Sequence, residues 1–214
     1  MILPTDTELV QAAAATYAPH SKPFIADLGQ AIRVFKTVRE DGLVIMAIEG
    51  THDAPGWMLD FFGVKADDQQ GMNHATLGFL HAGFYASAVS TLTRIALDVN
   101  GKQYAICGHS LGAIMALMVG SLLIQDGLPP VKIAAFAPPR GGGEQFVKVA
   151  TSVPCSAYRF GNDPVPMIPM ALPLFPWQQV PLIQIGQRMA WPFSAHAIDN
   201  YVAGVTAHEV AKES

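Results

Sequence analysis

Residues 103–113 read Gln-Tyr-Ala-Ile-Cys-Gly-His-Ser-Leu-Gly-Ala, and this stretch decides the fold. A short apolar run leads into Gly-x-Ser-x-Gly, and a long apolar segment follows, which predicts a strand, a tight turn and a helix. Gly108 and Gly112 lack a Cβ, so the strand and the helix can approach closely around Ser110. Such a turn lifts the serine out of the sheet and aims helix N-terminal amides at whatever it attacks. We therefore predict that Ser110 is a nucleophile.

Composition narrows the class of protein. The 214 residues fit one domain, residues 1–214, and half of them are hydrophobic while only 14% are charged. The net charge of −4 gives no basic footprint for nucleic acid, so we expect no nucleic-acid partner. No apolar run reaches the ~18–20 residues of a transmembrane segment, and residues 1–6 lack the basic start of a signal peptide. We therefore expect synthesis without export.

The two cysteines, Cys107 and Cys155, both fall in predicted strands. A free cysteine there behaves as a small buried hydrophobe. We expect no disulfide framework, and the spacing of cysteines and histidines offers no metal site.

Strands alternate with helices along the chain, which predicts an α/β protein with a mainly parallel, twisted sheet and helices on both faces. Together with the serine turn, this is the α/β-hydrolase arrangement. Asp41-Gly42 predicts a hairpin, so an antiparallel pair lies at the N-terminal side of the sheet. Besides the run before Gly108, the predicted strands are residues 31–38, 43–48, 131–136, 155–160 and 180–185. The predicted helices are residues 5–18, 81–99, 144–150, 196–205 and the segment after Ser110; residues 65–74 form a polar connection.

A serine hydroxyl needs a base within hydrogen-bond reach, and in this arrangement the acid and the histidine follow the serine in the chain. Two histidines follow Ser110, at positions 196 and 208. His208 lies in a polar tail and is interpreted as a solvated surface residue, whereas His196 stands between an apolar loop and a helix. We predict that His196 is the general base. His109, inside the turn, is expected to pack between helix and sheet, and His81 to cap or pack at a helix start.

Asp163 is the predicted acid because it leaves the C-terminal end of a strand, where open α/β sheets bind their ligands. Its alternative is a turn residue of Gly-Asn-Asp-Pro. Asp126 ends the helix after Ser110, a carboxylate at Glu144 is favourable for its helix dipole alone, and Asp199 lies too close to His196 in sequence.

The tetrahedral oxyanion of ester hydrolysis needs two backbone donors: the amide after the nucleophile, and one from an early loop after a strand. The first is predicted at Leu111. Thr51 directly follows a buried strand and is the best candidate for the second, with an ordinary turn residue as the alternative.

The order of several motifs resembles the class 3, fungal-type lipases over residues 43–202. The resemblance implies an α/β-hydrolase fold, a Ser110–Asp163–His196 triad, an oxyanion hole at Thr51 and Leu111, and lipid or ester hydrolysis without a cofactor. The motifs are Gly50-Thr51, Trp57-x-x-Asp60, His81-x-Gly83-Phe84, Gly108-His109-Ser110-Leu111-Gly112, Phe136-x-x-Pro139-Arg140-x-Gly142, Tyr158-Arg159, Asp163-Pro164-Val165-Pro166, and His196 ahead of Tyr201.

By position, residues 51–62 correspond to the lid of that family. The apolar side chains Trp57, Met58, Leu59 and Phe61 are available to face an acyl chain or a lipid interface. The alternative, that these residues fill the edge of the core, stays open.

The sequence therefore predicts a serine ester hydrolase acting on lipid or acyl esters. Short-chain carboxylesterase, phospholipase A and acyltransferase are the enzymatic alternatives. A lipid-binding or interaction module that retains the fold is the non-enzymatic one. The segment 164–193 is rich in proline and apolar residues, which favours a long acyl chain and leaves contact with a lipid interface open.

Overall fold

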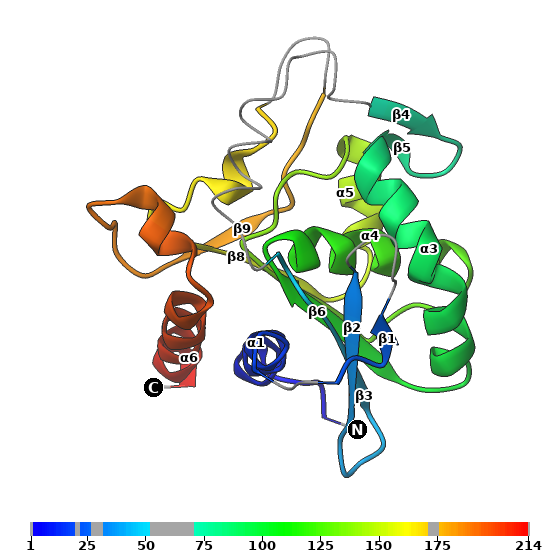
Figure 1. Cartoon of the computed structure of the whole chain (residues 1–214), viewed down its shortest axis with the longest axis horizontal. Coiled ribbons are helices and arrows are strands. Elements are labelled where there is room, and N and C mark those ends of the chain that lie inside the picture. Colours follow the sequence, from blue (N-terminus) through cyan, green and yellow to red (C-terminus); the bar gives the residue numbers. More distant parts are fainter. Residues whose placement is uncertain (1, 20–21, 27–31, 52–70, 171–175, 214) are drawn as a thin grey trace.

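The computed structural model of the chain describes residues 2–19, 22–26, 32–51, 71–170 and 176–213. Through the centre of this described part runs a seven-stranded sheet in the order β1-β2-β3-β6-β7-β8-β9 (Figure 1). Its strands are β1 (Ile25–Ala26), β2 (Arg33–Val38), β3 (Val44–Ile48), β6 (Tyr104–His109), β7 (Lys132–Phe136), β8 (Cys155–Phe160) and β9 (Leu182–Ile185).

The pairing of neighbouring strands changes once across the sheet, from antiparallel to parallel. β1, β2 and β3 pair antiparallel, with Val38 opposite Val44 at the hairpin. From β3 onward every pair is parallel. This confirms the predicted α/β-hydrolase sheet with its antiparallel side at the N-terminus.

Helices cover both faces of the sheet, as predicted. On one face lie α3 (Ala82–Val99), α4 (Leu111–Gln125) and α5 (Glu144–Ala150), and on the other α1 (Asp6–Ala15) and α6 (Ile198–Glu213) (Figure 1). The side chains of β3 alternate between the two faces. Met46 and Ile48 belong to the core under α3, α4 and α5, whereas Ile45 and Ala47 belong to the core under α1 and α6.

Side chains cap the starts of two helices. The hydroxyl of Thr5 accepts a hydrogen bond from the Glu8 amide at 3.0 Å and begins α1. The ring Nδ1 of His81 accepts from the Phe84 amide at 3.4 Å and begins α3, so His81 caps its helix as expected.

The polar stretch before residue 78 is not only a connection. It contributes β4 (Gly71–His74), which pairs antiparallel with β5 (Gly78–His81). The sequence Gly-Met-Asn-His carries no alternating apolar pattern, so this strand depends on its partner rather than on its own composition.

The C-terminal tail is wrongly predicted as polar and solvated. After the short turn η3 (Pro192–His196), helix α6 runs from Ile198 to Glu213, later in its start and longer than expected. Its residues Tyr201 and Val205 are fully buried against the sheet. His208 packs edge-on against Tyr158, with ring centroids 6.2 Å apart, so it is not a surface histidine.

Among the helices that the structure describes, none combines the length and the apolar character needed to span a membrane.

Candidate active site

The turn between β6 and α4 has the strained geometry of a nucleophile elbow. Ser110 adopts φ 59° and ψ −124°, a left-handed conformation that costs a side chain on the order of 1–2 kcal/mol. It is held there because its amide donates to the Phe136 carbonyl at 2.9 Å, while its own carbonyl accepts from Ile114 at 3.3 Å.

The two glycines of the elbow are required by close backbone contacts. A Cβ on Gly112 would lie 2.1 Å from the carbonyl oxygen of Ile48, and one on Gly108 would lie 2.3 Å from the carbonyl oxygen of Gly112. Both distances are shorter than atoms can approach, so the β3–β6–α4 junction closes only with glycine at these positions.

Ser110, His196 and Asp163 come together in a continuous chain of hydrogen bonds, although they are far apart in sequence. The Ser110 hydroxyl lies 2.9 Å from His196 Nε2, and His196 Nδ1 lies 2.8 Å from Asp163 Oδ2. All three are buried, with Ser110 at 1%, His196 at 4% and Asp163 at 0% exposure. With Nδ1–H donating to the carboxylate, Nε2 is left to accept the serine proton.

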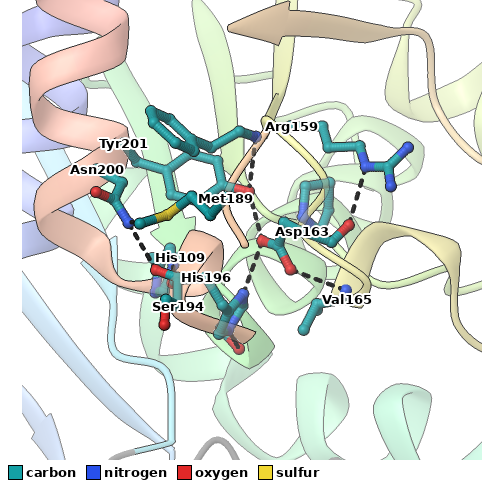
Figure 2. A network of polar contacts seen from close by, with 12 residues as sticks. His109, Arg159, Asp163, Val165, Met189, Ser194, His196, Asn200 and Tyr201 are labelled. Carbon is teal, nitrogen blue, oxygen red and sulfur yellow. Dashed lines mark hydrogen bonds and ion pairs between the residues drawn. The ribbon is translucent and has the colours of Figure 1, made fainter. Parts of the chain in front are cut away.

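Asp163 is held by two further donors. The Val165 amide donates to Oδ1 at 2.9 Å, and the hydroxyl of Tyr201 donates to Oδ2 at 2.6 Å (Figure 2). Burial, followed by the negative charge of Asp163, holds the pKa of Tyr201 well above its usual range, so its hydroxyl remains a donor. Sequence reasoning gave Tyr201 no role, since a contact across 38 residues leaves no local pattern.

The loops that carry the acid and the histidine are joined to each other. The Asn162 side chain donates to the Met189 carbonyl at 3.0 Å and accepts from the Met189 amide at 2.8 Å. Arg159 Nε donates to the Asp163 carbonyl at 2.9 Å (Figure 2). These bonds fix the spacing between the two loops on which the His196–Asp163 pair depends.

The two expected oxyanion donors both lie beside Ser110. Leu111 is the first residue of α4, directly after the serine. Thr51 follows Gly50, and a Cβ placed on Gly50 would lie 3.3 Å from the Ser110 Cβ, so the end of β3 passes next to the nucleophile. The expected lid residues Trp57, Met58, Leu59 and Phe61 lie outside the described residues.

Comparison with known proteins identifies the family. The sequence profile of the family described as Lipase (class 3) matches residues 45–172. The chain belongs to the class 3 lipase family. This confirms the resemblance predicted from the order of the motifs.

Individual relatives of this member of the class 3 lipase family are distant. It is 28% identical over 131 residues to a secreted mono- and diacylglycerol lipase of Fusarium solani, an alignment that covers 59% of this chain and 39% of the relative. It is 31% identical over 127 residues to the toxin TseL of Vibrio cholerae, covering 57% of this chain and 20% of the toxin. The aligned part of the chain thus spans well under half the length of these curated relatives.

Solved structures show the same fold. A crystal structure of a mutant form of MDLA from Penicillium cyclopium superposes with a TM-score of 0.62 at 21% identity, covering 82% of this chain and 77% of the other. The family match contains Thr51, Ser110, Leu111 and Asp163, whereas His196 lies C-terminal to it.

Proposed function

We propose that this class 3 lipase hydrolyses carboxylic esters of lipids or other acyl compounds, with Ser110 as the nucleophile. One observation carries the proposal: a buried serine on a strained elbow is hydrogen-bonded to a histidine that is in turn hydrogen-bonded to a buried carboxylate. A binding module has no physical need for this arrangement, because the strain and the burial of charge both cost stability.

In the proposed reaction the Ser110 oxygen attacks the ester carbonyl while His196 Nε2 takes the hydroxyl proton. Asp163 orients the imidazole and stabilises its charged form. The amides of Thr51 and Leu111 would hold the tetrahedral oxyanion, which collapses to an acyl-enzyme as His196 returns the proton to the leaving alcohol. Water activated by His196 then attacks the acyl-enzyme and releases the acid.

For the substrate, we propose an acylglycerol or a similar acyl ester. The name of the Fusarium solani relative supports a mono- or diacylglycerol. Short-chain esters are the alternative, since the acyl chain length depends on segments near the site rather than on the triad itself.

We further propose that the loops of the acid and the histidine contact the lipid. Three large apolar side chains stand out from them: Met167 is 41% exposed, Met170 62% and Trp191 64%. Met167 and Met170 follow Asp163 within seven residues, and Trp191 precedes His196 by five. Phe193 packs against Val165 and Ile168, so the two loops form one surface. Exposed apolar groups gathered in this way are typical of sites that meet a lipid or protein partner.

The test is a rate series on p-nitrophenyl esters from acetate to palmitate, run with wild type and Ser110→Ala. We expect turnover in wild type and its loss in the mutant, with unchanged circular dichroism and thermal unfolding. Ser121→Ala is the matched control, because Ser121 is also buried, on α4, and its hydroxyl has no hydrogen-bond partner among the described residues. Ser110→Ala activity near that of wild type would contradict the proposal.

A further inference from the structure

We propose that Tyr17 and His109 form a positioning pair, which holds the strand end before Thr51 and the backbone of His196 in register around Ser110. The inference rests on the proposed function, because it concerns how precisely the nucleophile, the base and the oxyanion donor are placed. Neither residue touches the reacting atoms.

His109 is bonded through both of its ring nitrogens. Nε2 lies 3.0 Å from the carbonyl oxygen of His196, and Nδ1 lies 3.0 Å from the hydroxyl of Tyr17. A carbonyl oxygen can only accept, so Nε2 carries the proton, and Nδ1 must then accept from the tyrosine. His109 thus holds the main chain of His196, whose own ring bonds the serine next to His109.

Tyr17 connects the other end of this path to β3. A Cβ on Gly50 would lie 2.2 Å from the Tyr17 hydroxyl oxygen and 2.5 Å from the His109 carbonyl oxygen, so the three groups are in close contact. The Gly50 backbone lowers the pKa of Tyr17 slightly against the larger effect of burial, as expected for a backbone amide close to the hydroxyl oxygen.

Both hydrogen bonds of the path run in one direction. Tyr17 donates to His109 and His109 donates to the His196 carbonyl, while the Gly50 backbone lies against the Tyr17 hydroxyl. The path thus joins Gly50, which precedes the expected oxyanion donor Thr51, to His196, which supplies the base. It passes through His109, the residue before the nucleophile.

The charged and titratable groups that face the pair favour its neutral form. Burial, and then the charge of His196, hold the pKa of His109 well below its usual range. Burial, followed by the negative charge of Glu49, raises the pKa of Tyr17 above its usual range. Glu49 is itself paired with Arg33 at 3.0 Å. A neutral His109 with a fixed tautomer is what the geometry requires.

Tyr17 comes from the turn that follows α1, 92 residues before His109 in sequence. The rings of His109 and His196 lie 4.8 Å apart, so a change in the tilt of His109 reaches the base directly. Displacements of about 1 Å in such supports can cost on the order of 100-fold in rate. We expect loss of the pair to lower kcat while substrate binding stays unchanged.

Tyr17→Phe tests this, because it removes the hydroxyl and keeps the ring. We expect kcat on a soluble p-nitrophenyl ester to fall roughly 10- to 100-fold with KM within about twofold of wild type. Tyr104→Phe is the control: Tyr104 is a buried tyrosine whose hydroxyl donates to the main-chain carbonyl of Leu128, at the end of β6 opposite to Ser110. It should lose stability and keep its kcat. If both variants lose kcat in proportion to their loss of Tm, the role is only structural and the proposal is overturned.

Substitution of His109 gives a second readout. His109→Gln retains a donor toward the His196 carbonyl, whereas His109→Leu retains none. We therefore expect the kcat of the glutamine variant to be at least about tenfold higher than that of the leucine variant. Equal kcat values for the two variants, at equal Tm, would contradict the positioning role.

The tautomer of His109 can be measured without turnover, by ¹⁵N NMR of the imidazole nitrogens. We expect a neutral Nε2–H ring at pH 7 in wild type and in Ser110→Ala. A protonated ring, or an Nδ1–H tautomer, would overturn the pairing even in an active enzyme. A wild-type chain without ester turnover would contradict the proposed function alone, and this spectrum would still decide whether the pair exists.

Discussion

At the scale of the residue, the site depends on a few positions where only one side chain fits. Ser110 is held in left-handed geometry by backbone bonds to β7 and α4, and the two elbow glycines lie in backbone contact with β3 and α4. The residue types that satisfy these constraints lie within residues 108–112, which is why Gly-x-Ser-x-Gly predicts the turn. The strain is tolerated because the packed sheet and helix over-determine the turn.

Two glycines at equivalent helix positions allow the steric cost of an added Cβ to be distinguished from the gain in helix propensity. Gly112 and Gly83 are each the second residue of their helices, α4 and α3. The nearest atom to a Cβ on Gly83 is 3.4 Å away, whereas on Gly112 it is 2.1 Å away and belongs to the backbone. We expect Gly112→Ala to prevent folding or to lower the free energy of unfolding by at least ~3 kcal/mol. We expect Gly83→Ala to raise the free energy of unfolding by about 0.5–1 kcal/mol. Urea denaturation measures both, and equal effects would contradict the close approach.

The residues that local patterns did not reveal are those whose partners are distant in the chain. Ser110, Asp163 and His196 are predictable because each follows a strand in a fixed order. Tyr201 and Tyr17 are not, because the contact of Tyr201 with Asp163 and that of Tyr17 with His109 depend on how α6 and the α1 region pack. Buried polar networks of this kind leave no periodic trace in the sequence.

At the scale of the element, the strands and helices with strong apolar patterns were predicted and the weakly patterned ones were not. β3 and α4 are buried on nearly every residue, so composition alone identifies them. β4 has no apolar pattern, and in the described part of the chain its strand partner is β5. α6 extends beyond the predicted end at residue 205, where His208 packs against Tyr158, a contact that a polar residue type does not reveal.

If the surface formed by the acid and histidine loops contacts lipid, changes to it should affect emulsified and soluble substrates differently. We expect the double variant Met170→Ser, Trp191→Ser to lose roughly tenfold in activity on an emulsified long-chain ester, about the effect of keeping one large apolar side chain in water. Activity on soluble p-nitrophenyl acetate should stay within about twofold of wild type, because neither side chain belongs to the triad.

Leu97→Ser is the control for that surface. Leu97 is 76% exposed but lies on α3 just before β6 begins, while Ser110 follows the other end of β6. The control should leave both activities unchanged. An equal loss on emulsion in the control, or on the soluble ester in the double variant, would refute the assignment of this surface to lipid contact.

The helix cap of α3 makes the stability depend on pH. Burial lowers the pKa of His81 from 6.5 to about 4. Between these values the unfolded chain binds more protons than the folded chain, so stability is present above pH 6.5 and falls as the pH approaches 4. Asn can also accept from the Phe84 amide, so His81→Asn keeps a cap without the titration. We expect the stability advantage of wild type over this variant, measured by urea midpoints, to shrink between pH 7 and pH 4.5. Parallel curves would contradict the account.

At the scale of the whole molecule, α1 and α6, from the two terminal parts of the chain, lie side by side on one face of the sheet (Figure 1). The Glu209 carboxylate of α6 accepts from the backbone amides of Asp6 and Thr7, both at 2.7 Å, at the start of α1. A carboxylate at a helix N-terminus satisfies unpaired amides and complements the helix dipole. Because the α1 region supplies Tyr17 and α6 supplies Tyr201, this junction supports the site from both sides.

We expect Glu209→Gln to lower the free energy of unfolding by on the order of 1 kcal/mol. Glu144→Gln is the control, since Glu144 is an exposed glutamate in the first turn of α5 that pairs with Lys148 one turn later in the same helix. Chemical denaturation of both variants measures the difference. A loss at position 144 as large as that at position 209 would argue against a specific role of the junction.

The central claim is that Ser110 is a nucleophile activated by His196 and Asp163. Its most direct test is labelling with a fluorophosphonate, followed by peptide mass spectrometry, in wild type, Ser110→Ala and His196→Ala. The account predicts one adduct per wild-type chain on Ser110, none in Ser110→Ala and a rate at least about 100-fold lower in His196→Ala. A folded wild-type chain that stays unlabelled, or one labelled at another residue, would contradict it.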